Sequence, residues 1–156
     1  MRTWDKEPPE PWEIVLTPKR MFMFFEKDHL WREIWLDGRQ LSQDPDPTWN
    51  GTSTASWEGN VLVVKSNGFN DGTWLDYAGD PHSDQMTLEE RYERVDKSTL
   101  SVTVTVTDPK AYTAPWKGAP KFYNLEPDWE IHEWYCTQDD SKSYDDQIRL
   151  KAPSGK

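Results

Sequence analysis

The chain has 156 residues and a net charge of −10, with 28 acidic and 18 basic residues. Phe, Ile, Leu and Val together number only 27, a fraction typical of disordered chains. However, ten Trp, six Tyr and four Met add twenty large side chains, and each Trp or Tyr can bury roughly 150–250 Å². The composition therefore predicts one folded domain and excludes a disordered tail, a collagen-like chain and a disulfide scaffold.

The acidic balance also limits the partners. Nucleic acids and anionic membranes attract basic proteins, because Lys and Arg neutralise phosphates, so we expect neither as a partner. Cys136 is the only cysteine, which excludes an internal disulfide and a Cys-based zinc site. No apolar run reaches the roughly 20 residues of a membrane-spanning helix.

Alternation with a period of two residues dominates the chain and predicts short β-strands. The clearest is Leu100–Thr107, where Val alternates with Ser and Thr. Thr52–Trp57 and Val61–Ser66 flank a turn at Glu58-Gly59-Asn60 and predict a hairpin. Further strands are predicted at Ile14–Leu16, Met21–Glu26, Leu30–Leu36, Leu88–Val95, Ala119–Asn124 and Glu130–Cys136.

About nine short strands with mostly tight turns predict an antiparallel meander, either a barrel or a sandwich. Two long connections, Gln40–Trp49 and Asn67–Gln85, interrupt it. We expect residues 1–11 to form an extended arm and residues 12–137 the single β-domain. Residues 138–156 are expected to form a polar tail, in which Ile148 and Leu150 could add one edge strand.

One stretch, from Pro11 to Cys136, carries more than a generic β pattern. It contains in order Asp37-Gly38-Arg39, Pro47-Thr48-Trp49-Asn50-Gly51, Trp57-Glu58-Gly59, Gly68-Phe69-Asn70-Asp71, Thr73-Trp74-Leu75-Asp76, Pro81-His82-Ser83 and Asp108-Pro109-Lys110. These motifs resemble those of a family of uncharacterised secreted proteins from soil-type bacteria. The resemblance implies an extracytoplasmic location, periplasmic or secreted, although we expect no signal peptide in the residues given. It also implies an all-β, lipocalin-like fold, and we therefore predict a closed barrel of about 8–10 strands.

The connection Asn67–Gln85 is the leading candidate for a site, because long irregular loops in compact domains are often functional. An imidazole beside carboxylates can act as a general acid or base near neutral pH. We therefore predict that His82 and Asp76 are catalytic and that Asp71 and Trp74 bind the ligand. The alternative is that these side chains cap turns and bind the loop's own backbone.

Charged residues on apolar strand faces form a second candidate site. Arg32, Glu90 and Glu133 share faces with apolar neighbours, and Tyr135 lies on the face of Glu133. A buried charge costs several kcal/mol unless it is paired, so we hypothesise that Arg32 meets Glu90 or Glu133 inside the barrel. The pair could fix the register of the barrel, or these four residues could bind a polar ligand group.

The three histidines, His29, His82 and His132, could share a metal, but no local spacing supports this. We therefore predict no metal and no cofactor. Small barrels have room for one ligand, so we predict a small-molecule-binding barrel, monomeric or homodimeric. It would be either an acid–base enzyme (a lyase, isomerase or hydrolase) or a non-catalytic secreted module that binds carbohydrate or protein through exposed aromatic residues.

Overall fold

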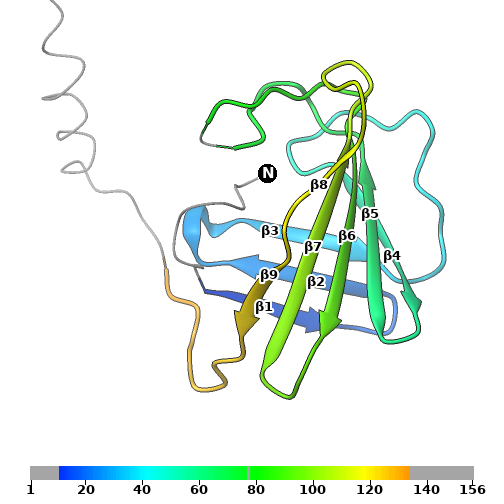
Figure 1. Cartoon of the computed structure of the whole chain (residues 1–156). Coiled ribbons are helices and arrows are strands. Elements are labelled where there is room, and N and C mark those ends of the chain that lie inside the picture. The colour runs from blue at the N-terminus through cyan, green and yellow to red at the C-terminus, as the bar shows by residue number, and fades with distance from the viewer. Residues whose placement is uncertain (1–10, 77, 134–156) are drawn as a thin grey trace, which may run out of the picture.

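The computed structural model describes residues 11–76 and 78–133, which form nine strands of one sheet (Figure 1). The strands are β1 (Trp12–Leu16), β2 (Arg20–Phe25), β3 (Trp31–Trp35), β4 (Thr52–Glu58), β5 (Val61–Asn67), β6 (Thr87–Arg94), β7 (Thr99–Thr107), β8 (Trp116–Lys117) and β9 (Lys121–Asn124). The one helical element among these residues is a single 3₁₀ turn, η1 (Lys27–His29). The predicted all-β class is confirmed, and in this part of the chain no helix has the length and apolar character to cross a membrane.

The order of strands follows the chain from β1 to β8, and β9 pairs with β7 beside β8. Every pairing is antiparallel except that of β3 with β4, where Ile34 and Trp35 lie opposite Ser53 and Thr54 in parallel. The predicted meander is therefore antiparallel everywhere but here. The reason is the long connection of residues 36–51, because parallel strands need a crossover of about a dozen residues or more.

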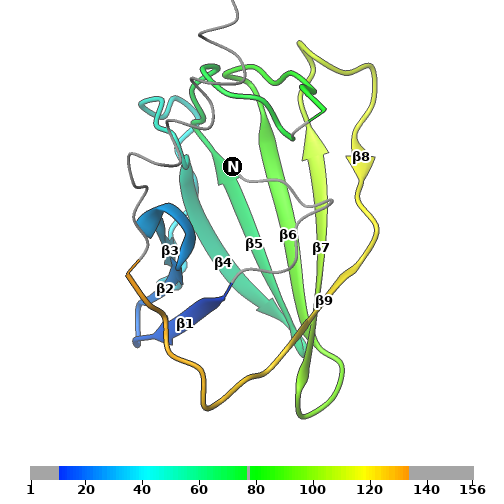
Figure 2. The same cartoon turned by 90° about the vertical axis from the view of Figure 1, so that its left-hand side faces the viewer.

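The sheet curls into an open, lipocalin-like half-barrel. Figures 1 and 2 show β1–β3 running across the direction of β5–β7. Among the described residues no strand pairing joins β1 to β8 or β9. Instead, the Trp12 ring on β1 packs edge-on against Tyr123 of β9, with ring centroids 5.2 Å apart. Side-chain packing thus bridges the gap that a fully closed barrel would fill with hydrogen bonds.

The concave face of the sheet carries the core. Val102, Val104 and Val106 of β7 are buried there, as the alternation of Leu100–Thr107 predicts. The other buried side chains of this core cluster are Met21, Met23, Ile34, Leu62, Val64, Phe69, Leu75, Met86, Leu88 and Tyr92. The alternation therefore places the buried face of β7 correctly, and most of the core comes from inward-facing positions of β2, β3, β5, β6 and β7. The tryptophans do not form it as the composition suggests, because no tryptophan among the described residues is buried.

The two long connections meet at one end of the sheet, the upper end in Figure 1. Thr48 donates its N–H to the Gly68 carbonyl (2.9 Å), and Asn70 donates to the Thr48 carbonyl (2.9 Å). Gly68 has φ +74°, and a Cβ there would lie 2.8 Å from Pro45, so both the backbone angle and the packing require glycine. This end of the half-barrel is therefore covered by packed loops, whereas the β4–β5 and β6–β7 turns lie at the opposite end.

Removal of buried core atoms should lower the free energy of unfolding far more than the same change on the exposed edge strand. Ile34→Ala, at a side chain 0% exposed, should lower the free energy of unfolding by about 2–5 kcal/mol, because it leaves a cavity. Ile14→Ala on β1, 37% exposed, should cost less than about 1 kcal/mol. Urea unfolding of both variants measures the difference, and equal losses would contradict the assignment of the core.

Candidate functional site

Two of the three charges that the sequence placed on apolar strand faces, Arg32 and Glu90, meet in the concave face. Arg32 Nη1 donates to Glu90 Oε1 at 3.0 Å, and Nη2 donates to Oε2 at 2.5 Å. The side chains are 16% and 1% exposed, respectively. The hypothesis that Arg32 pairs with an inward-facing carboxylate is confirmed for Glu90. Glu133 lies exposed at the surface, so it is not the partner, and Tyr135 falls outside the described residues.

Three hydroxyl groups complete this cluster, which we call the Arg32 network. Arg32 Nε and Nη2 donate to Ser53 Oγ (3.1 and 3.0 Å), and Nη2 also donates to Ser66 Oγ (2.7 Å). The Tyr92 hydroxyl donates to Glu90 Oε1 at 3.1 Å. Because protein groups occupy most of the hydrogen-bonding capacity of the guanidinium and the carboxylate, little is left for a ligand. This favours the interpretation that the pair fixes the sheet over the one that it binds a ligand.

The ionisation states of Arg32 and Tyr92 in this network are held fixed. Burial acts to lower the pKa of Arg32, but the Glu90 carboxylate outweighs it and the pKa is raised. Burial raises the pKa of the Tyr92 hydroxyl well above its usual value, and the charge of Glu90 adds to this while Arg32 opposes it. Arg32 therefore stays charged and Tyr92 stays a proton donor across the physiological range, which suits a structural cross-link.

The loop of residues 67–86 holds its predicted catalytic residues in bonds of its own. His82 is 8% exposed, its Nε2 lies 2.8 Å from Thr73 Oγ1, and its Nδ1 lies 3.4 Å from the Ser83 carbonyl. Asp76 Oδ1 accepts the backbone N–H groups of Ala78 (2.9 Å) and Asp80 (3.2 Å). These contacts match the alternative to catalysis, in which the side chains cap turns and bind their own loop.

The two predicted ligand-binding residues of this loop lie at the surface. Asp71 is exposed, and Trp74 is 68% exposed. The structure therefore does not bring Asp71 or Trp74 together with the Arg32 network in one enclosed pocket.

A buried carboxylate from the Asp108-Pro109-Lys110 motif, for which the sequence predicted no role, anchors this loop. Asp108 accepts the backbone N–H and the hydroxyl of Ser83 (2.5 and 2.7 Å) and the backbone N–H groups of Lys110 and Ala111. Burial acts to raise the pKa of Asp108, but these hydrogen bonds outweigh it and hold the pKa below its usual value. The Tyr112 hydroxyl adds a bond to the Pro81 carbonyl (2.7 Å). The loop is therefore fastened to the end of β7.

Two further expectations concern the C-terminal part and metal binding. The strand predicted over Glu130–Cys136 is wrong for Glu130–Glu133, which are not in a strand, and its remaining residues lie outside the described chain, as do residues 138–156. Within residues 11–76 and 78–133, no three His, Cys, Asp or Glu side chains gather as a metal site would need.

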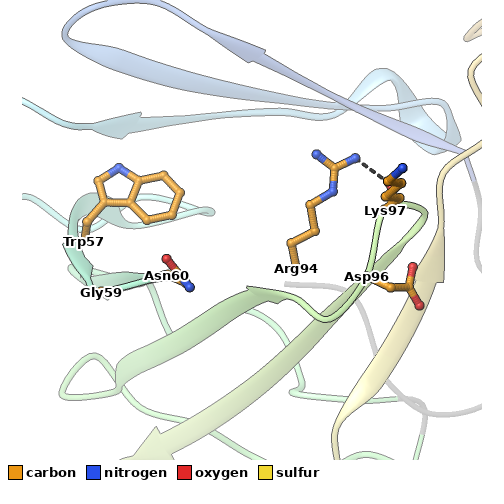
Figure 3. A pocket seen from close by; sticks show the side chains of 6 residues that line it. All are labelled: Trp57, Gly59, Asn60, Arg94, Asp96 and Lys97. Carbon is orange, nitrogen blue, oxygen red and sulfur yellow. Dashed lines mark hydrogen bonds between the residues drawn. The ribbon is translucent and has the colours of Figure 1, made fainter.

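An open hollow lies at the end of the half-barrel away from the packed loops (Figure 3). It has a volume of about 830 Å³. Its lining residues are Trp57 near the end of β4, Gly59 and Asn60 of the β4–β5 turn, Arg94 at the end of β6, and Asp96 and Lys97 of the β6–β7 turn. Figure 3 shows Trp57 and Arg94 on opposite sides of it. We call it the Trp57–Arg94 hollow.

Sequence reasoning missed this hollow, although a signal was present. Arg94 occupies the next position on the β6 face that already carries Glu90 and Tyr92, and it pairs in register with Leu100. A third polar group on this face could have pointed to the mouth of the half-barrel. The contribution of Trp57 depends on how closely the two turns approach, which no local pattern encodes.

Comparison of the whole chain with family models, curated proteins and solved structures finds no match. The family resemblance therefore stays a prediction, and the functional argument depends on the geometry of the chain itself.

The Arg32 network should behave as one unit in stability measurements. Glu90→Leu alone leaves a buried guanidinium without its partner and should lower the free energy of unfolding by about 3–5 kcal/mol. Adding Arg32→Met should recover most of that loss, because the unpaired charge is gone. Additive losses in the double variant, measured by urea unfolding, would contradict the pairing.

The anchor of the loop should give the protein a specific sensitivity to acid. Since the pKa of Asp108 is lower when folded than its value of 3.8 when unfolded, its carboxylate stabilises the fold above that pH. This contribution is lost as the pH falls through the folded pKa. Asp108→Asn should therefore lower stability at pH 7 and flatten its dependence on pH below about 4. Asp128→Asn, at an exposed position, serves as the control and should follow the parent curve.

Proposed function

We propose that this protein binds a small molecule at the mouth of its half-barrel, in the Trp57–Arg94 hollow. The observation that carries the proposal is the hollow itself, about 830 Å³ in volume, which falls in the range of about 300–1,000 Å³ common for ligand sites. Its lining is one exposed indole, one glycine and four polar or charged side chains, which is more polar than the lining of a typical enclosed pocket and suits a ligand that carries a polar or charged group.

The bonds of the other candidate residues support binding over acid–base catalysis. His82 and Asp76 each bind groups of their own loop, and Arg32 binds Glu90 and two serines. In contrast, the side chains of Trp57, Arg94 and Lys97 are exposed beside the hollow. We further propose, from the family resemblance, that the ligand is met outside the cytoplasm.

A second candidate function has a specific observation in its favour. The convex face of β1–β3 carries Phe22 stacked on Phe24 and tilted against Trp31, with both pairs of ring centroids 6.3 Å apart. Trp31 is 56% and Phe24 38% exposed. Exposed aromatic clusters are typical of interaction surfaces, so this face favours a non-catalytic module that binds carbohydrate or protein.

Three tryptophan variants separate these functions. Small molecules retained by the native protein would first be identified by mass spectrometry, and their binding then measured by titration calorimetry. Trp57→Ala should weaken binding at least about tenfold, because a buried aromatic contact contributes more than about 1.4 kcal/mol. Trp129→Ala, at a position 66% exposed compared with 63% for Trp57, is the matched control and should leave affinity unchanged.

The same experiment distinguishes the two candidates. Loss of binding in Trp31→Ala, with Trp57→Ala unaffected, would transfer the function to the convex face and overturn the proposal.

A further inference from the structure

One arginine differs from the others in its partner. Arg20, Arg32, Arg39 and Arg91 each bind a carboxylate, those of Glu33, Glu90, Asp37 and Glu58, respectively. Arg94 is the one arginine of residues 11–76 and 78–133 that the structure leaves without such a partner. Its Nη2 donates instead to the backbone carbonyl of Lys97 at 2.7 Å.

This bond orients the Arg94 side chain without neutralising its charge. A carbonyl is uncharged, and it occupies only one of the five N–H donors of a guanidinium. The other four donors, one on Nε, two on Nη1 and one on Nη2, remain for a ligand in the hollow that Arg94 lines. A guanidinium held in this way matches the planar geometry of a carboxylate, sulfate or phosphate group.

A second cation reinforces the first. Lys97 also lines the hollow and, among the described residues, binds no carboxylate. The carboxylate between them, Asp96, accepts the N–H and hydroxyl of Ser98 (2.8 and 3.1 Å), and Figure 3 shows it turned away from Arg94. Counting the Asp96 carboxylate, the three charged residues that line the hollow leave a net charge of +1 there, on a chain whose net charge is −10.

The wall of the hollow opposite Arg94 favours a flat apolar group in the ligand. The Trp57 indole faces Arg94 across the hollow and is 63% exposed, so a flat apolar ligand body can stack on it. A long polyanion is disfavoured here, because the acidic remainder of the surface would repel it. A single small anion avoids most of that repulsion, since salt screens charges beyond about 8–10 Å.

We infer that the ligand of the Trp57–Arg94 hollow is a small organic anion with a planar apolar body, whose charged group binds Arg94 and Lys97 while its body stacks on Trp57. This inference rests on the proposed function and names the chemical class of its ligand.

Three probes with one ring system and different charge test the inference on the full chain: 2-naphthoate, 2-naphthamide and 2-naphthylmethylammonium. We expect 2-naphthoate to bind about tenfold more tightly than the other two in calorimetric or NMR titrations. Arg94→Gln and Lys97→Gln should each weaken 2-naphthoate about fivefold or more and leave 2-naphthamide unchanged. Arg94→Lys, which keeps the charge, should retain most of the affinity.

A matched control and a salt titration separate the effect of the charges that line the hollow from that of the protein's other charges. Lys117→Gln removes one exposed positive charge outside the hollow and should change the affinity for 2-naphthoate less than twofold. Higher NaCl should weaken 2-naphthoate selectively. Melting curves of each variant check that the fold is retained.

Different outcomes would overturn the anionic class of the ligand or the proposed binding site. Equal affinity for 2-naphthoate and 2-naphthamide, with NMR shifts at Trp57, would overturn the anionic class and leave the proposed function standing. Binding of all three probes that Trp57→Ala does not change would overturn the proposed function as well. A loss in Lys117→Gln equal to that in Arg94→Gln would show a general charge effect and also overturn the inference.

Discussion

The ion pair of Arg32 and Glu90 lies where the sheet changes direction. Arg32 belongs to β3, Ser53 to β4, Ser66 to β5 and Glu90 to β6, so their bonds join four neighbouring strands from within. The β3–β4 pairing is the one parallel junction and has only two residue pairs in register. Such a short ladder holds two strands weakly, and the buried network supplies a cross-link whose disruption would leave a charge without a partner. We therefore expect the curl of β1–β3 across the rest of the sheet to depend on it.

This cross-link divides the half-barrel into two ends with different character. Above the Arg32 network, the two long connections pack on each other and Asp108 fastens the second of them to β7. Below it, the inward face of β6 continues from Tyr92 to Arg94, which lines an open hollow. A rigid interior and one open end are what a binding site needs, because groups that do not reorganise bind a ligand with less loss of entropy. The residues that hold the fold and the residues offered to a ligand are therefore distinct sets.

Much of this architecture was predictable from local pattern. The alternation in Leu100–Thr107 identified β7 and its buried face, and the Glu58-Gly59-Asn60 turn located the β4–β5 hairpin. The argument that a charge on an apolar strand face needs a partner predicted that Arg32 pairs with Glu90 or Glu133, because the cost of an unpaired buried charge is general; which of the two it is depends on the fold.

The remainder depends on contacts that the local sequence does not encode. The parallel β3–β4 junction follows from how the long connection packs, and the short β8 has too few residues to show a period. His82 and Asp76 were favoured by residue type, yet their bonds are set by the loop's closure on itself. Trp57 and Arg94 are brought to one hollow by the approach of two separate turns. In each case the missing information is the distance between segments that no pattern along the chain relates.

Hydrogen exchange of the native protein, followed amide by amide by NMR, tests most directly whether the Arg32 network holds the sheet together. The account predicts that the amides of β3, β4, β5 and β6 beside the network exchange only through global unfolding, with one common free energy. The amides of the β4–β5 and β6–β7 turns should exchange through local opening at lower free energy. If β3 and β4 instead separate in a partial opening that leaves β5–β7 protected, the network does not hold the sheet, and the central claim is contradicted.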